Sequence, residues 1–378
     1  MHMDTSATPA DLAATWIPPR GTHGPFWRWA PLVTQAAGLE PVSLHEGGTP
    51  MLGSRLWHGV WWKDEGRNPT GSHKDRALSL AAADARASGA RHLAVVSAGS
   101  TGLSCAAYAA RAGLSATILF TPGTAPHNLV PLQALGATLV EITTDIDTAI
   151  AALSALDGRH GIRVCSTTRA ANSVQAEAAQ TIAYEIVADL GHAPDQVVVP
   201  TGGGGTIAAI HDGFSRLRAM GVIDRNPRLI AVVPDRYDTL HRALKEGVDG
   251  DAVFSLPPPA GGATVLNKLA HAHPPDGRWA LAALRESGGQ VITVSDEAAL
   301  AAVPRLGTNE GLFVEPSSAV ALVALDQLDR SGQLAGTTTV ALACGHGFRE
   351  TAALADRTDR RHQVQPDTLE ALLARLDG

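Results

Sequence analysis

Short runs of apolar, mostly β-branched residues alternate with alanine-rich stretches through most of this chain, and this alternation limits the folds open to it. The apolar runs have the length of strands buried on both faces, and the alanine-rich stretches have the length of helices. Parallel strands need such crossover helices, so the pattern predicts an α/β protein. One sheet would need many strands in sequence; we therefore expect two lobes, each a mostly parallel sheet covered by helices. The expected strands are 93–96, 116–120, 138–142, 196–199, 229–233, 290–293 and 338–343, and the expected helices include 102–112, 126–135, 176–190 and 295–306.

The composition indicates a globular chain and argues against several kinds of partner. With 378 residues, 45% of them hydrophobic, the chain has enough apolar material for two lobes. A net charge of −7 without any basic run argues against nucleic acid, and no apolar run is long enough to span a bilayer. The opening residues lack the pattern of a signal peptide. We expect a cytoplasmic protein with no nucleic acid and no membrane as partner.

Cysteine and histidine usage gives no sign of a disulfide framework or a metal. Cys105, Cys165 and Cys344 are odd in number and widely spaced, which predicts reduced thiols. His271 and His273 lie close together, but in a proline-rich stretch with no neighbouring cysteine or carboxylate motif. We predict no metal site.

The segment 68–76 reads Asn-Pro-Thr-Gly-Ser-His-Lys-Asp-Arg and leads into an apolar helical stretch. The first four residues favour a turn, so Lys74 falls in the first helical turn, where the helix dipole opposes a cation. That position favours loss of the lysine proton, and a neutral amine is what an imine with an aldehyde cofactor requires. Lys74 is therefore the candidate catalytic residue. The alternative is an ordinary loop-to-helix junction with a solvated lysine.

Four consecutive glycines, 202–205, separate a buried strand from a helical stretch. Because glycine has no Cβ atom, the loop amides can converge on a phosphate, and the helix N-terminus adds a favourable potential. The spacing is not Gly-x-Gly-x-x-Gly, and no lysine follows as in a nucleotide P-loop, so a nucleotide is disfavoured. We predict a loop that binds a phosphate group, with a flexible turn as the alternative.

A small polar segment, 97–102, follows the expected strand 93–96 and precedes a helix. Its hydroxyl groups and exposed amides suit a carboxylate. A plain helix start capped by Ser100 or Thr101 fits the same residues.

The expected strand 338–343 ends in Cys344-Gly345-His346-Gly347. A free cysteine in such a place is usually a small core residue. Together with Lys74 and the glycine loop, Cys344 can instead be the hydrogen-bond partner of a cofactor ring nitrogen.

These segments together resemble the fold-type II pyridoxal-phosphate-dependent enzymes, which have a tryptophan synthase β-like fold, and among them the threonine synthases most of all. The resemblance covers nearly the whole chain, from about residue 26 to 348. Segment 44–50 is similar to the family's Leu-Gly-Glu-Gly-x-Thr-Pro, and 68–76 to its Asn-Pro-Thr-Gly-Ser-Phe-Lys-Asp-Arg. Segment 315–319, Glu-Pro-Ser-Ser-Ala, resembles another recurrent family segment, and 344–347 resembles its Thr-Gly-His-Gly.

The resemblance implies pyridoxal 5′-phosphate as cofactor, joined to Lys74 as a Schiff base. Cys344 then contacts the pyridine nitrogen, where other members have Thr, Ser or Cys. The cofactor phosphate would lie at Gly202, Gly203, Gly204, Gly205 and Thr206. Ser100 stands where the family has an asparagine that bonds the phenolic oxygen of the cofactor, and the substrate carboxylate would lie at Ser97, Ala98, Gly99 and Thr101.

The chain departs from the threonine synthase pattern at three positions. Ser100 replaces the asparagine, and His73 replaces the phenylalanine before the lysine, as in tryptophan synthase β chains. Gln175 aligns with the arginine that binds the substrate phosphate, which removes a charge-assisted contact of about 2 kcal/mol. Arg169 and Asn172 are nearby as substitutes.

The resemblance implies a lyase of amino-acid metabolism that converts O-phosphohomoserine and water into threonine and phosphate. Two alternatives remain: β-elimination or β-replacement on a serine-type substrate, as in serine/threonine dehydratases or cysteate synthases, and a non-catalytic member that binds an amino acid. The family habit implies a homodimer. We expect a disordered tail at 1–16, a larger cofactor-binding lobe from 17–87 and 161–355, a smaller mobile lobe at 88–160, and a C-terminal helical tail at 356–378.

Overall fold

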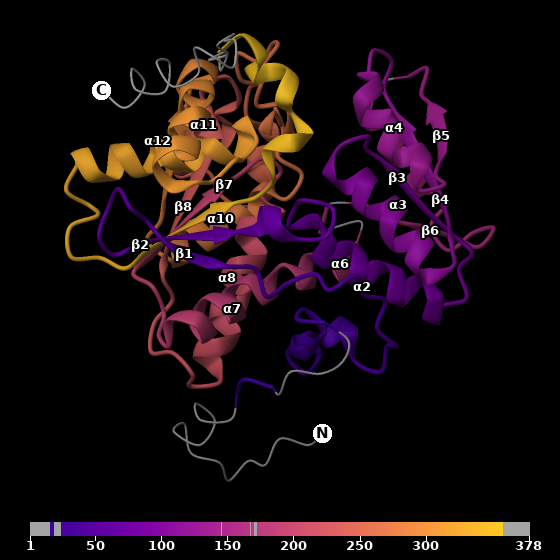
Figure 1. The fold of residues 1–378 in the computed structure, drawn as a ribbon, viewed down its shortest axis with the longest axis horizontal. Coiled ribbons are helices and arrows are strands. Elements are labelled where there is room, and N and C mark those ends of the chain that lie inside the picture. The colour runs from indigo at the N-terminus through magenta and orange to yellow at the C-terminus, as the bar shows by residue number, and fades with distance from the viewer. Residues whose placement is uncertain (1–15, 19–23, 145, 167, 170–171, 358–378) are drawn as a thin grey trace, which may run out of the picture.

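The computed structural model describes residues 16–18, 24–144, 146–166, 168–169 and 172–357, and contains two β-sheets side by side (Figure 1). The larger has the strand order β1-β2-β10-β7-β8-β9, in which only the β1–β2 pair is antiparallel. The smaller, β5-β4-β3-β6, is entirely parallel. The prediction of two lobes built on parallel sheets is confirmed. The large-sheet strands are β1 (Met51–Gly53), β2 (Val60–Asp64), β7 (Gln196–Pro200), β8 (Arg228–Pro234), β9 (Gln290–Val294) and β10 (Thr339–Ala343); the small-sheet strands are β3 (His92–Val96), β4 (Ser115–Phe120), β5 (Thr138–Glu141) and β6 (Ile162–Val164).

Helices connect the strands and cover the sheets. The α-helices are α2 (Lys74–Ala87), α3 (Ser100–Ala112), α4 (Pro126–Ala134), α5 (Ile146–Ser154), α6 (Ser173–Ala178), α7 (Gln180–Leu190), α8 (Gly205–Ala219), α9 (Thr239–Lys245), α10 (Gly277–Glu286), α11 (Asp296–Glu310) and α12 (Pro316–Arg330). Short 3₁₀ helices lie at Trp27–Leu32, Thr34–Ala36, Glu65–Arg67, Asp235–Tyr237, Gly250–Ser255, Asn267–Leu269, Gly347–Arg349 and Thr351–Arg357.

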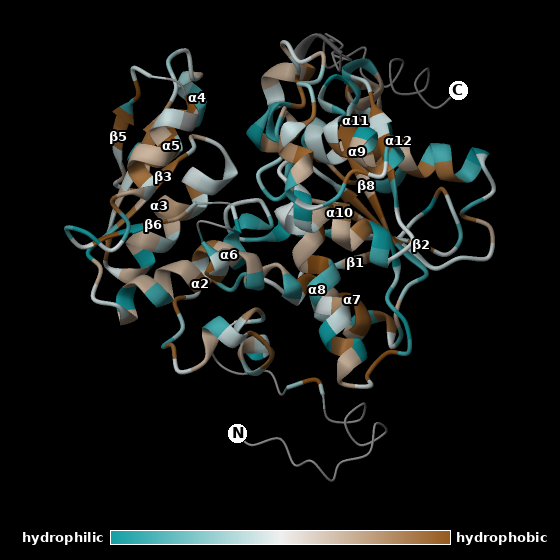
Figure 2. Cartoon of the chain, turned by 180° about the vertical axis from the view of Figure 1, so that it is seen from behind, coloured by the Kyte–Doolittle hydropathy of each residue, from teal (hydrophilic) through white to brown (hydrophobic). Residues whose placement is uncertain are grey.

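Both faces of the large sheet are buried, which explains why its strands are apolar without alternation. On β7, Val197 and Val199 join a core that includes residues of α7, α8 and α10. Val198, pointing the other way, joins a second core with residues of α11 and α12. Figure 2 shows these apolar strands inside the molecule, with hydrophilic residues gathered on the outer faces of the helices. No helix among the described residues has the length and apolar character needed to cross a membrane.

All seven expected strands are present, and the described part of the chain contains three further strands that were not expected. β2 was missed because it ends in Lys63 and Asp64, charged residues that are nevertheless buried in the folded chain. β1 and β6 have three residues each, too short to give a clear pattern. The helix expected at 176–190 is interrupted at Ala179, where the Thr181 hydroxyl donates to the carbonyl oxygen of Ala178 (2.7 Å) and competes with the helical ladder.

The lobe boundaries stay a prediction, although β6 pairs with β3, so the small sheet itself extends to Val164. Most of the tail expected at 1–16 and most of that at 356–378 lie outside the described residues.

Candidate active site

Segments that are far apart in the sequence meet at a pocket of about 430 Å³. Its walls come from the start of α2, the ends of β3, β7 and β10, and the segment 267–276. The residues expected from the sequence that line the pocket are Lys74, Ser97, Gly99, Ser100, Thr101, Gly202, Gly203, Gly204, Gly205, Thr206 and Cys344.

Lys74 is the first residue of α2, as the turn before it predicts. The backbone N–H of His73 donates to the carbonyl oxygen of Cys344 (3.1 Å), which holds this helix start against the end of β10. Burial lowers the pKa of Lys74, although the nearby carboxyl group of Asp276 acts in the opposite direction. The position therefore favours the neutral amine that a nucleophile or base needs.

The glycine loop between β7 and α8 has no room for side chains at Gly202 and Gly204. A Cβ atom on Gly202 would lie 2.8 Å from the carbonyl oxygen of Lys268, and one on Gly204 would lie 2.9 Å from the Cβ of Ala280. Gly204 also has a φ of 93°, a conformation that glycine adopts without strain. No side chain caps the N-terminus of α8, so its first amides are available to an anion.

Cys344 follows β10 and is 7% exposed. Burial, followed by the nearby carboxylate of Glu315, raises the pKa of its thiol. The thiol therefore stays protonated at neutral pH and offers a weak donor or acceptor to a ring nitrogen.

The segment 97–102 starts α3 with a close turn. A Cβ on Gly102 would lie 1.8 Å from the carbonyl oxygen of Ser97, so only glycine fits there. The N-cap of α3 is Gly99 and has no side-chain cap, so neither Ser100 nor Thr101 caps the helix. Ala98 is not among the residues that line the pocket.

Arg169 lies beside the pocket, next to Thr168, which lines it. Its guanidinium forms an ion pair with Asp212 of α8 and lies 5.7 Å from the ring centroid of Trp279. Its backbone N–H donates to the carboxylate of Asp276 (2.8 Å). The substitute Asn172 donates to the carbonyl oxygen of Val164 (3.3 Å), and the side chain of Gln175 lies outside the described residues.

The sequence offered no signal for one wall of the pocket, the segment 267–276, which follows a proline- and glycine-rich stretch. Asp276, 1% exposed, lines the pocket, and burial raises the pKa of its carboxyl group. Lys268 also lines it and pairs with Glu315 and with Glu350 (2.9 Å). These side chains reach the site only because the loop folds over the glycines.

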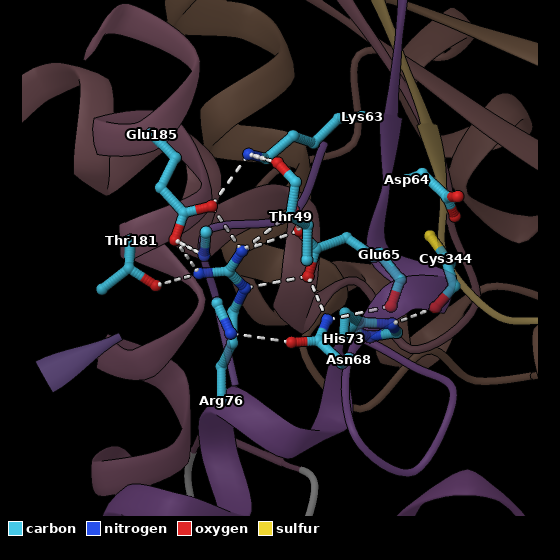
Figure 3. A network of polar contacts seen from close by, with 12 residues as sticks. Thr49, Lys63, Asp64, Glu65, Asn68, His73, Arg76, Thr181, Glu185 and Cys344 are labelled. Carbon is cyan, nitrogen blue, oxygen red and sulfur yellow. Dashed lines mark hydrogen bonds and ion pairs between the residues drawn. The ribbon is translucent and has the colours of Figure 1, made fainter. Parts of the chain in front are cut away.

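A buried charge network holds the loop that precedes Lys74 (Figure 3). Arg76 donates to Glu65 (2.8 Å) and to Glu185 of α7 (2.6 Å), and Lys63 of β2 pairs with Glu185 (2.8 Å). The backbone N–H of Gly48 donates to Glu185 as well (2.8 Å). The network thus joins the segment 44–50 to the segment 68–76.

Comparison with known proteins agrees with this geometry. A model of the family described as "Pyridoxal-phosphate dependent enzyme" matches residues 42–345, and the chain therefore belongs to this family. Threonine synthase of Methanosarcina acetivorans is 32% identical, over 87% of this chain and 81% of that protein. Threonine synthase of Mycobacterium tuberculosis (strain H37Rv) is 33% identical, over 88% of this chain and 92% of that protein.

Solved structures similar to this chain show the same fold. O-ureido-L-serine synthase has a TM-score of 0.67 at 20% identity and covers 86% of this chain and 97% of its own. The processed form of threonine deaminase isoform 2 from Solanum lycopersicum has a TM-score of 0.68 at 21% identity and covers 82% and 87%.

The cofactor of this family is pyridoxal phosphate, and the pocket fits it. The glycines exclude side chains where a phosphate needs to approach backbone amides, and a lysine and a buried thiol lie in the same pocket.

Proposed function

We propose that this chain is a pyridoxal-phosphate-dependent lyase of the threonine synthase type, which converts O-phosphohomoserine and water into threonine and phosphate. The observation that carries the proposal is the single pocket that unites Lys74, the glycine loop and Cys344. Identity of 32–33% to threonine synthases over most of the chain supports the choice of reaction.

The pocket residues that the sequence indicated have proposed tasks. When bound, pyridoxal phosphate supplies an electron sink for the charge that develops at the substrate Cα. The neutral amine of Lys74 removes the Cα proton and later returns a proton. The amides and hydroxyls of 97–101 would hold the substrate carboxylate, and the thiol of Cys344 would contact the ring nitrogen without imposing a full positive charge on it.

The smaller lobe, proposed at 88–160, closes over the substrate and excludes water. Its helix α5 supplies Ile146 and Ile150 to the pocket wall, which supports this task. We also propose a cytoplasmic homodimer. The three free, buried cysteines support a reducing compartment.

The reaction is tested by incubating purified protein with O-phosphohomoserine and measuring released phosphate and threonine. The second candidate is β-elimination on serine or threonine, which Ser100 and Gln175 favour because they replace an asparagine and a phosphate-binding arginine. Formation of a 2-oxo acid and ammonia from serine, with no phosphate released from O-phosphohomoserine, would replace the first candidate by the second.

Gly203→Val is expected to lower cofactor affinity at least about tenfold, because the new side chain prevents the loop amides from reaching the phosphate. A Cβ atom added to Gly203 would lie 3.3 Å from the side chain of Pro275. Affinity is measured by titrating the cofactor absorbance, with circular dichroism to verify the fold. Gly307→Ala, where a Cβ meets nothing within 4 Å, is the control. Unchanged occupancy in Gly203→Val would show that the phosphate lies elsewhere.

Arg169→Ala is expected to raise the KM for O-phosphohomoserine about tenfold or more, because Arg169 is the proposed substitute for the missing phosphate-binding arginine. Binding phosphate requires the guanidinium to leave Asp212, so Asp212→Asn should leave KM unchanged or lower it. If Arg169 merely anchors its loop, both variants weaken the same ion pair and raise KM equally. The KM values of both variants are measured from steady-state phosphate release.

A further inference from the structure

The side chain of His73 lies between two parts of the cofactor site. Its Nδ1 is 3.3 Å from the carbonyl oxygen of Cys344, a contact drawn in Figure 3, and its Nε2 is 3.3 Å from the hydroxyl of Thr206. Thr206 is the second residue of α8 and lines the pocket beside the glycines. The imidazole thus joins the end of β10 to the proposed phosphate loop.

The partners of His73 determine the direction of both hydrogen bonds. A carbonyl oxygen only accepts, so Nδ1 carries the hydrogen and donates to Cys344. Burial, followed by the charge of Lys74, lowers the pKa of His73 to about 3, so the ring is neutral at neutral pH. Nε2 is then an acceptor, and the Thr206 hydroxyl must donate to it.

Other charges near the His73 ring shift its pKa in both directions. Glu65 favours the protonated imidazole, whereas Arg76 opposes it, as Lys74 does. Lys74 becomes less repulsive when its amine is neutral, and a phosphate dianion in the loop would add a strong attraction for a proton on the ring.

While the His73 ring is neutral, the Thr206 hydroxyl has no hydrogen to donate to a dianionic phosphate. Thr206 has one hydroxyl hydrogen, and His73 uses it, so toward the pocket the hydroxyl offers only lone pairs. A phosphate dianion also has only acceptor oxygens, and two acceptors face each other unless one more hydrogen is present.

We propose that the protein binds its cofactor phosphate together with one proton, shared along the chain phosphate–Thr206–His73. Solvent supplies the proton, Nε2 becomes a donor to the Thr206 hydroxyl, and that hydroxyl turns its own hydrogen toward the phosphate. His73 is thereby a positioning residue that acts through Thr206. The inference rests on the proposed phosphate loop and is independent of which reaction follows.

Pyridoxine 5′-phosphate is the probe, because it has no aldehyde and cannot react with Lys74. The full-length chain, freed of cofactor, is titrated by calorimetry at about pH 8, where a phosphate with a second pKa near 6 is a dianion. Buffers of different ionisation enthalpy report the number of protons taken up. We expect uptake of about one proton per bound ligand. The affinity for the ligand should then fall about tenfold for each unit by which the pH rises near pH 8.

Matched variants show how much His73 and Thr206 each contribute to the proton uptake. His73→Phe and Thr206→Val should bind with almost no proton uptake, whereas Thr206→Ser, which keeps the hydroxyl, should behave as wild type. In the holoenzyme labelled with ¹⁵N-histidine, His73 should show hydrogens on both ring nitrogens at the same pH, assigned by their loss in His73→Phe.

Three results would overturn the proposal. Tight binding without proton uptake would mean that Thr206 turns to the phosphate and leaves Nε2 unpaired. Equal uptake by wild type and His73→Phe would place the proton elsewhere. Failure of the probe to bind would contradict the phosphate loop itself, and the proton with it.

Discussion

Replacing Lys74 with alanine is expected to reduce turnover roughly 10³-fold or more, because one residue serves as covalent anchor, base and acid. The position at the start of α2 and the lowered pKa make this amine the reactive one in the pocket. Steady-state rates measure the loss. Reduction with borohydride, followed by peptide mass analysis, tests whether the cofactor is still attached to the chain.

Lys268 provides a matched control, since it lines the same pocket but is paired with Glu315 and Glu350. Lys268→Ala should keep the cofactor attached after reduction, and the modified peptide should contain Lys74. A reducible attachment that persists in Lys74→Ala would show that another lysine carries the cofactor.

Replacing Arg76 with methionine is expected to lower the free energy of unfolding by about 3–5 kcal/mol. Its guanidinium is fully buried between Glu65 and Glu185, so its removal leaves two carboxylates without their main partner. Urea unfolding followed by circular dichroism measures the change. Because the same network holds the loop before Lys74, cofactor affinity should fall as well.

Arg305→Met is the control for this change. Arg305 pairs with Asp326 at the surface, and exposed pairs of this kind contribute about 0.2–1 kcal/mol. Equal losses in the two variants would contradict a special role for the buried network.

The network also has a pH dependence of defined sign. Burial alone would raise the pKa of Glu65 and Glu185, but Arg76 lowers both below the ordinary value of 4.5. A carboxylate with a lowered pKa stabilises the fold fully above its ordinary value, and this contribution declines as the pH falls below it. Wild type should therefore lose this stabilisation in acid, and Arg76→Met should lose less.

Several features of the site could be predicted because their causes are local. The turn at 68–71 brings Lys74 into a first helical turn, and four glycines between a strand and a helix form a loop in which Gly202 and Gly204 admit no Cβ. Strands β7, β8, β9 and β10 could be predicted because they are largely apolar runs between helical stretches, as expected of parallel strands covered on both faces.

Other features depend on contacts between distant segments. β2 is a central strand although it ends in Lys63 and Asp64, because Glu185 of α7 compensates Lys63 from 122 positions away in the chain, a partner that no local pattern reveals. In the sequence, His73 is only a histidine at the position where the threonine synthase pattern has phenylalanine. Its role emerges only from its contacts with Thr206 and Cys344.

The parallel architecture, the lysine at a helix start and the glycine loop all follow from the preferences of neighbouring residues, so they could be predicted from the sequence. The shared pocket could not, nor could the place of Asp276 and Lys268 in its wall or the ion pair between Arg169 and Asp212. Burial, ion pairing and hydrogen-bond direction depend on which groups are close in space, and the folded chain brings these groups together from separate segments.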